Sequence, residues 1–208
     1  MTGPWSWSVE VDPGRWLVVP QEAPAPWVAA VVAATRETIA AFVTEQTGPE
    51  GPDALGSPEI TRMCEEAVAN LCAFADGVGP GGGVVAAVGL LDRTPVPVLV
   101  AVDVAEDGAE PADLLALCGA SGGSPVEDPR VEHLDLPDGD GVRVVRLDVG
   151  ERSGDVWASV ALGRRVEHPD AVIDTLLVWR TTDLVLLPAM VELLDELLAA
   201  VHVARSDA

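Results

Sequence analysis

Apolar and polar residues alternate in the first segment of the chain, residues 5–11, where every second position is apolar. A period of two is typical of a β-strand that buries one face. Residues 12–15, Asp-Pro-Gly-Arg, favour a turn because proline presets φ and glycine accepts positive φ. An apolar run, residues 16–19, follows. The pattern predicts an N-terminal hairpin in which Trp5 and Trp7 share one face and cover a sheet.

Three longer segments repeat apolar residues every three or four positions, which is the pattern of an amphipathic helix. They span residues 26–45, 57–76 and 188–203. Ser57 is a good N-cap for the second helix, and Pro58 suits its first helical position. The sequence therefore predicts two N-terminal helices and one C-terminal helix.

Strand patterns dominate between the second and the last helix. Turn residues interrupt them, most clearly in Pro-Asp-Gly-Asp-Gly at residues 137–141 and in Glu-His-Pro-Asp at residues 167–170. A short helix is predicted at residues 112–118, and a glycine-rich loop at residues 119–125. Strands joined by hairpins form an antiparallel sheet. We therefore expect an α+β fold, one domain over residues 1–208, with a sheet of about six to eight strands beneath the three helices.

The charge of the chain restricts its partners. It has 34 acidic and 12 basic residues, a net charge of −22, and all the basic residues are arginine. Absence of lysine with abundant Ala, Gly and Pro indicates a GC-rich coding bias, as in actinobacteria. Such an acid excess disfavours binding to nucleic acid and to anionic membranes, since both need clustered cations on the protein surface. It favours encounter with a protein that has a basic surface.

The cysteines and the hydropathy pattern bear on location. The three cysteines, Cys64, Cys72 and Cys118, do not form a disulfide framework and are expected to be free thiols in a reducing compartment. No signal-peptide pattern is seen at the N-terminus. The longest apolar stretch, residues 84–102, contains charges and prolines and is interpreted as two strands. These features predict a cytoplasmic protein without membrane insertion.

No pattern of residues points to catalysis, a metal or a cofactor. The glycine run at residues 77–83 follows a helix and precedes a strand, whereas a phosphate-binding loop follows a strand and opens a helix. Ser121 lacks the preceding strand of a nucleophile turn, and the three histidines lie outside known motifs. The acidic turn at Asp138 and Asp140 lacks a calcium-loop spacing. A hydrolase using a carboxylate or His133 is the enzymatic alternative.

Tryptophans and arginines are the best candidates for partner binding. The arginines occur on predicted adjacent strands, where Glu132 and Asp174 are acidic neighbours available for cross-strand pairing. The alternative for the arginines is a partner or anion site on an exposed sheet face. The candidate partner-binding residues are Trp5, Trp7, Trp157, Arg164, Arg165 and Arg180.

Several segments resemble actinobacterial members of the PsbP-like α+β family. They are the opening hairpin, Val166 to Pro169 within a long hairpin, Trp179 to Thr181 at the end of a strand, and Leu193 to Asp195 in the closing helix. The resemblance implies a sheet with covering helices and a role in binding or assembly, in some members beside specialised secretion loci. It implies no catalytic residue.

These observations together predict a non-enzymatic interaction protein, an adaptor, chaperone or assembly factor in a bacterial cytoplasm. A structural subunit of a larger assembly is a further alternative. Homodimerisation through the terminal helix or an edge strand is left open by the sequence.

Overall fold

The computed structural model describes residues 5–48, 53–90, 94–106, 110–136, 138–150 and 154–205. Contacts group the chain into two compact units. Residues 12–98 are called the helical unit here, and residues 1–11 with 99–208 the sheet unit. The predicted single domain over residues 1–208 stays a prediction.

The helical unit contains two strands and two long helices. The elements are β2 (Trp16–Val19), α1 (Ala25–Thr47), α2 (Pro58–Asp76) and β3 (Gly82–Ala87), and β2 pairs antiparallel with β3. The Ser57 side chain accepts a hydrogen bond from the Ile60 amide at 3.4 Å, so the predicted cap of α2 is confirmed. The two helices begin with proline in their first turn, where the missing N–H costs no hydrogen bond.

An apolar core joins α2 to the β2–β3 pair. Its buried residues are Val19, Leu71, Ala75, Val84 and Ala86, and Trp27 of α1 packs against them. Much of α1 is exposed: only 22% of an 18-residue window with mean hydropathy 1.3 is buried. By length and composition alone this helix could cross a membrane, a test that core helices of soluble proteins also pass.

The sheet unit is built around five antiparallel strands in the order β4-β8-β7-β6-β5. The strands are β4 (Val96–Glu106), β5 (Arg130–Leu136), β6 (Gly139–Val149), β7 (Val156–His168) and β8 (Ala171–Thr181). β4 begins in the helical unit at Val96 and enters the sheet unit at Leu99. The predicted hairpins β5–β6 and β7–β8 are confirmed. Within them Glu132 pairs with Arg143, and Asp174 pairs with Arg165.

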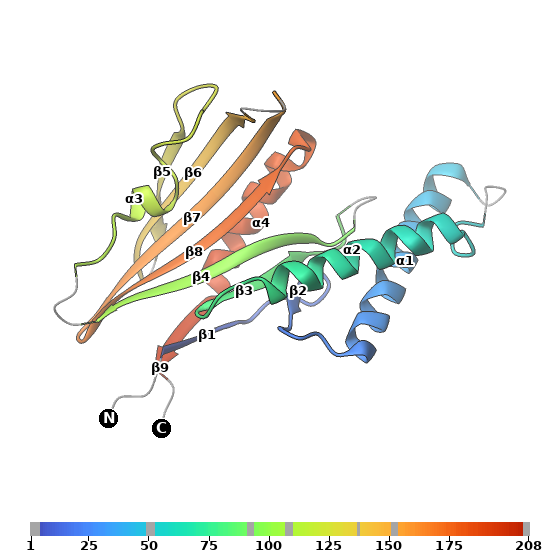
Figure 1. Cartoon of the computed structure of the whole chain (residues 1–208), viewed down its shortest axis with the longest axis horizontal. Coiled ribbons are helices and arrows are strands. Elements are labelled where there is room, and N and C mark those ends of the chain that lie inside the picture. The colour runs from blue at the N-terminus through green and yellow to red at the C-terminus, as the bar shows by residue number, and fades with distance from the viewer. Residues whose placement is uncertain are drawn as a thin grey trace. The chain divides into compact units, whose positions relative to one another are not determined.

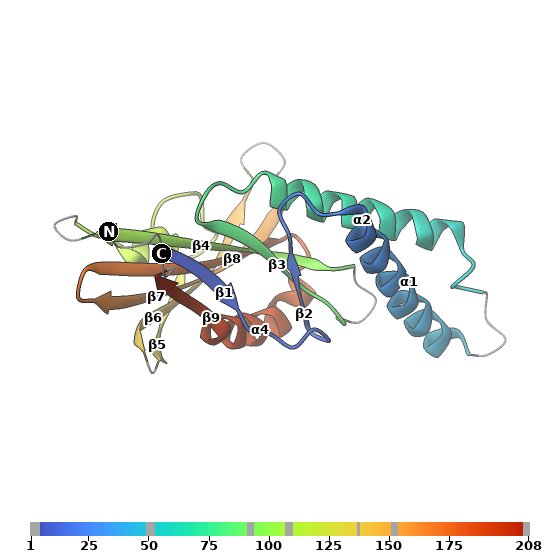
Figure 2. The ribbon, with the colours of Figure 1, turned by 90° about the horizontal axis from the view of Figure 1, so that it is seen from below.

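Two helices cover opposite faces of this sheet. Successive residues of one strand point to opposite sides, so neighbouring residues of β6 contact different helices. Helix α4 (Leu187–Ala200) follows the short 3₁₀ turn η1 (Leu184–Leu186) and lies along one face (Figures 1 and 2). Arg143 of β6 reaches Asp195 of α4 on that side. The short helix α3 (Leu114–Leu117) lies on the other face, where Cys118 packs on Val142, Val144 and Ala161. The predicted α+β class is confirmed.

The predicted N-terminal hairpin is wrong. The turn forms, since the amides of Arg15 and Trp16 donate to the Asp12 carbonyl at 3.0 and 2.9 Å. However, β1 (Trp5–Val9) pairs antiparallel with β9 (Val201–Arg205) in a separate two-stranded sheet, whereas β2 pairs with β3. Sequence neighbours were assumed to pair, but both strands find their partners far along the chain.

The C-terminal helix is also shorter than predicted. It ends at Ala200, and the residues predicted as its last turn form β9 (Figure 1). Val201 is fully buried and lies opposite Val9 in the β1–β9 pair. The alternating Val201, His202 and Val203 suit a half-buried strand, and pairing with β1 supplies backbone hydrogen bonds that replace those of the helix.

Candidate functional site

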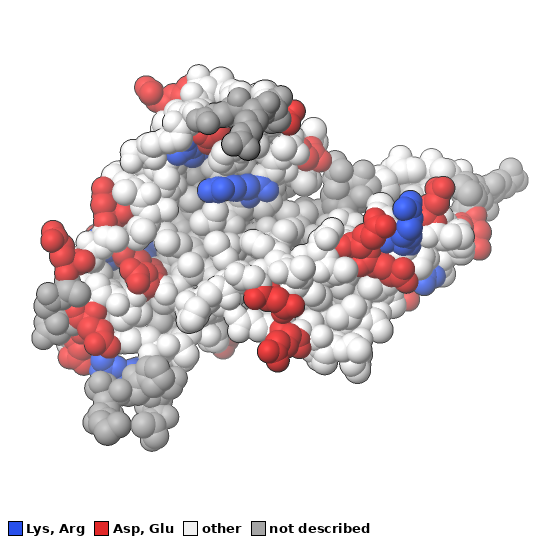
Figure 3. Space-filling view, viewed as in Figure 1, with Lys and Arg blue, Asp and Glu red and all other residues white. Residues whose placement is uncertain are grey.

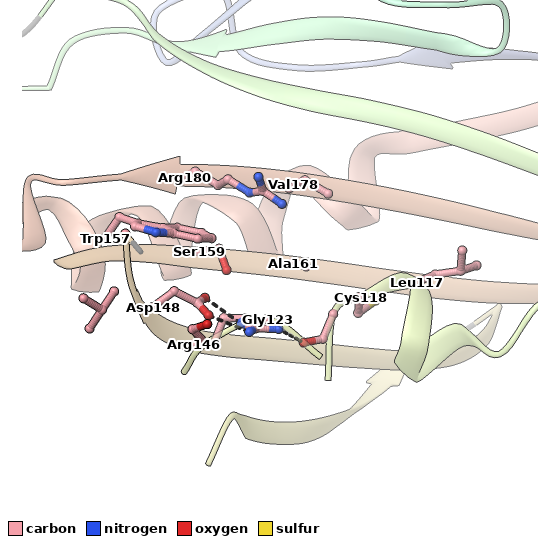
Figure 4. A pocket seen from close by; sticks show the side chains of 14 residues that line it. Leu117, Cys118, Gly123, Arg146, Asp148, Trp157, Ser159, Ala161, Val178 and Arg180 are labelled. Carbon is pink, nitrogen blue, oxygen red and sulfur yellow. Dashed lines mark hydrogen bonds and ion pairs between the residues drawn. The ribbon is translucent and has the colours of Figure 1, made fainter. Parts of the chain in front are cut away.

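A pocket of about 490 Å³ opens on the α3 face of the sheet unit (Figure 4). Strands β6, β7 and β8 form its floor and one wall, and the loop that follows α3 forms the opposite wall. The polar, aromatic and thiol side chains of the lining are Cys118, Ser124, Arg146, Asp148, Trp157, Ser159 and Arg180.

Arg146 and Asp148 form a nearly buried ion pair at the base of the pocket. Both lie on β6 two residues apart and so share a face. Arg146 donates from Nε and Nη2 to the two Asp148 carboxylate oxygens, at 2.7 and 2.6 Å. Relative exposure is 9% for Arg146 and 2% for Asp148. This bidentate geometry satisfies both charges in a poorly solvated position.

The same guanidinium holds the glycine-rich loop against the sheet. Arg146 Nη1 donates to the Gly119 carbonyl at 2.6 Å, and Nη2 donates to the Gly122 carbonyl at 2.8 Å. Gly123 has φ +70°, and a Cβ there would lie 2.4 Å from Arg146 Nη2. Only glycine fits this approach without displacement. The loop is confirmed as predicted, but Arg146 as its anchor was not predicted. The available signal was an Arg-x-Asp pair within a strand.

Trp157 and Arg180 stand together on the pocket wall formed by β7 and β8. The Arg180 guanidinium carbon lies 5.1 Å from the centre of the Trp157 ring, within the range of a cation–π contact. Arg180 is exposed and Trp157 is half-buried. Within the described part of the chain, the Arg180 guanidinium has no carboxylate or carbonyl partner. Two of the six predicted partner-binding residues are thus brought together.

The lining of the pocket is positive in a strongly negative protein. It contains two arginines and one aspartate, a net charge of +1, against −22 for the whole chain. The Arg146 charge is matched by Asp148, so Arg180 supplies the excess. A cation without a partner beside an aromatic ring points to recognition of an anionic group.

Exposed apolar side chains also lie at this end of the sheet unit, and of the four named here Val149 lines the pocket. Val149 and Val156 face each other where β6 and β7 end and begin, and they are 37% and 40% exposed. The turn after β8 adds Leu184 and Val185, which are 43% and 81% exposed. Figure 3, which views the α3 side, shows few charged side chains over the middle of β8 and β4.

The Cys118 thiol lines the pocket but is buried under α3. It is 3% exposed, and a Cβ added to Gly163 on the strand below would lie 2.7 Å from its sulfur. Burial, with a smaller contribution from the Asp174 charge, raises the pKa of Cys118 to about 11. The thiol is therefore neutral and a poor nucleophile at physiological pH.

We expect Cys118 to resist a thiol reagent such as iodoacetamide in the folded protein, and to react once urea unfolds the chain. The folded pKa lies above the unfolded one, so the neutral thiol stabilises the fold below pH ~8.5, and this contribution is lost as the pH rises toward 11. Mass spectrometry locates the label, with half-buried Cys72 as the internal comparison. Equal labelling of both cysteines in the folded protein at pH 7 would contradict the burial of Cys118.

Arg164 and Arg165 are engaged within the chain. Arg164 is 4% exposed, donates to the Val201 carbonyl at 2.6 Å and lies 3.3 Å from an Asp138 oxygen. Arg165 binds both carboxylate oxygens of Asp174, at 2.7 and 2.6 Å. Both guanidinium groups therefore have acidic partners within the chain, and both residues cross-link parts of the sheet unit.

Trp5 and Trp7 lie on β1, away from the pocket residues in sequence and in pairing. Trp5 meets the His168 ring edge-on at 5.0 Å between centroids, and the Arg205 guanidinium carbon lies 5.0 Å from its ring centre. Arg205 also pairs with Asp170 at 2.9 Å. Trp5 thus fastens the β1–β9 pair to the β7–β8 turn, while Trp7 is half-buried opposite Val203.

His133 lies on β5, exposed beside a shallow cleft that also contains Asp140 and Arg165. Among the described residues, no hydrogen bond links His133 to a carboxylate, and no three metal-ligating side chains gather in one place. Ser121 lies in the loop held by Arg146, between Gly119 and Gly122.

No protein-family model matches the chain, and no curated protein matches it. Among solved structures, the chain is similar to LpqN of Mycobacterium tuberculosis, a protein described as involved in cell envelope biogenesis. The superposition covers 97% of this chain and 85% of LpqN, with 8% sequence identity and a TM-score of 0.46.

Proposed function

We propose that this chain is a non-enzymatic interaction protein, an adaptor, chaperone or assembly factor whose partner docks at the pocket on the α3 face. The observation that carries the proposal is the Trp157–Arg180 pair on the pocket wall. Tryptophan and arginine are the residues most enriched in binding hot spots. Leu184 and Val185, exposed on the turn that follows β8, offer further apolar area for a partner to bury.

The charge distribution supports a protein as the partner. Outside the pocket the chain is strongly acidic, which speeds encounter with a basic surface and disfavours nucleic acid and anionic lipid. The proposal includes a location in a bacterial cytoplasm, and its support is the three free cysteines, which suit a reducing compartment.

The PsbP-like assignment and a link to specialised secretion belong to this proposal too. The support for the PsbP-like assignment is the placement of three of the four resembling segments: Val166 to Pro169 lies at the β7–β8 turn, Trp179 to Thr181 ends β8, and Leu193 to Asp195 lies within α4. The fourth segment, the opening hairpin, does not form. The link to specialised secretion rests on the resemblance alone.

The proposal is tested by capture of partners on the immobilised full chain from a lysate of the native organism. We expect at least one protein to be retained reproducibly by the wild type and lost, by roughly tenfold or more, from Trp157→Ala and Arg180→Glu. Arg62→Glu is the matched control. Arg62 lies on α2, its side chain is 73% exposed, and its ion pair with Glu66, at 3.8 Å, is solvated.

Circular dichroism of each variant confirms that the fold is kept before capture is compared. Retention of the same proteins by wild type, Trp157→Ala and Arg180→Glu would contradict the proposed docking site. Turnover of an ester or phosphate substrate by the purified chain, with no protein retained, would favour the hydrolase alternative instead.

A further inference from the structure

We infer that the pocket on the α3 face recognises a carboxylate carried by an apolar chain, with Arg180 as the residue that binds the carboxylate. The inference rests on the proposed function for the source of that group, a segment of a protein partner. The chemistry itself follows from the charges, the geometry and the lining of the pocket.

Only one of the two pocket arginines is available to a ligand. Arg146 uses Nε, Nη1 and Nη2 to bind Asp148 and two loop carbonyls. Its charge is balanced by Asp148 at 2.6 Å. Arg180 has no such partner among the described residues, so the pocket offers one uncompensated positive charge. A single negative charge on the ligand neutralises it.

The Trp157 ring prepares Arg180 for a planar anion. A guanidinium stacked on an aromatic face keeps its edge N–H groups directed outward, and that edge matches the two oxygens of a carboxylate. The ring also limits the rotamers of the long arginine side chain, which lowers the entropy lost on binding. The contact distance of 5.1 Å is within the usual range for such stacking.

The remaining lining suits an apolar body. Leu117, Ala161 and Val178 line the pocket together with Trp157. A volume of about 490 Å³ lies within the range of ligand sites and accepts a few amino-acid side chains. A phosphate group fits less well, because the described lining offers a dianion one free cation, which would leave it incompletely neutralised.

The test uses N-acetyl-L-leucine and N-acetyl-L-leucinamide, which share an apolar side chain and differ in the carboxylate. Binding to the full ¹⁵N-labelled chain is followed through the indole N–H resonance of Trp157, which is identified by its loss in Trp157→Phe. We expect the acid to shift this resonance with a Kd in the millimolar range and the amide to bind at least roughly tenfold more weakly.

Arg180→Gln removes the charge and keeps hydrogen-bonding capacity. In this variant the acid should bind as weakly as the amide, while the amide is unaffected; Arg62→Gln should leave both unchanged. Any of three results would overturn the inference. The wild type could bind acid and amide with equal affinity, neither ligand could shift the Trp157 resonance, or Arg180→Gln could keep the wild-type affinity for the acid.

Two further probes separate the sources of the carboxylate. A pentapeptide ending in Val-Leu with a free C-terminus represents a protein partner, and octanoate represents a free small acid. Tighter binding of the peptide supports a protein segment as the source of the carboxylate. Tighter binding of octanoate rejects that source, while recognition of a carboxylate stands. If Trp157→Ala loses the captured protein but the wild type binds acid and amide equally, this inference is overturned and the proposed function stands. If the wild type prefers the acid but captures no protein, the proposed function is overturned and this inference stands.

Discussion

Replacing Arg146 by methionine is expected to lower the free energy of unfolding by about 3–5 kcal/mol. The substitution keeps apolar volume but leaves the Asp148 carboxylate, 2% exposed, without its partner. The carbonyls of Gly119 and Gly122 also lose their donor. Urea denaturation followed by circular dichroism measures the change, and the loop wall of the pocket should loosen at the same time.

Two control variants separate the buried pair from surface electrostatics. Arg62→Met breaks an exposed pair and should cost about 0–1 kcal/mol. The double variant Arg146→Met/Asp148→Leu removes both buried charges and should recover much of the lost stability. It should not recover binding of N-acetyl-L-leucine, because the loop remains without its anchor. A loss below about 1 kcal/mol in Arg146→Met would show that the pair is solvated.

Leu198→Ala is expected to lower the free energy of unfolding by about 2–5 kcal/mol. Leu198 is fully buried on α4, with Leu194 and Leu197 as buried neighbours on the same helix. Truncation removes apolar contact and leaves a cavity that the sheet below cannot easily fill. Urea denaturation measures the loss, and an unchanged m-value would show that the unfolded state is unaffected.

Leu184→Ala is the matched control, since the chemical change is the same and Leu184 is 43% exposed. We expect a change within about 0.5 kcal/mol. Comparable losses in the two variants would mean that α4 is not packed as the structure shows.

The amino-acid pattern predicts local structure well wherever near neighbours along the chain decide the outcome. Ser57 and Pro58 begin α2 because a cap acts within one helical turn. The β5–β6 and β7–β8 hairpins follow from strong turns between alternating strands. The cross-strand pairs Arg143–Glu132 and Arg165–Asp174 follow from those hairpins, since pairing across a short turn fixes the register.

Predictions failed where pairing was non-local. Residues 5–9 and 16–19 suit a hairpin, yet β1 pairs with β9 almost 200 residues later, as in Ser6 with Ala204. Residues 201–203 continue a helical pattern but become part of strand β9, because β1 offers a complementary edge. Propensity at such positions is weak, and the partner strand settles the conformation.

The candidate site shows the same division. Sequence analysis selected Trp157 and Arg180 by residue type, in a group with four others, and only the register of β7 and β8 shows that these two share a pocket wall. The structure alone shows that Arg164 and Arg165 are matched within the chain and that Arg146 anchors the loop.

The sequence by itself determined the α+β class, most helix and strand positions, the hairpins and the acidic surface, because each depends on local pattern or total composition. Tertiary structure alone decided which of the two pocket arginines has no carboxylate partner among the described residues, where the two end strands pair, and which loop closes the pocket. These properties depend on contacts between residues distant in sequence, and many different long-range pairings are compatible with the same local pattern.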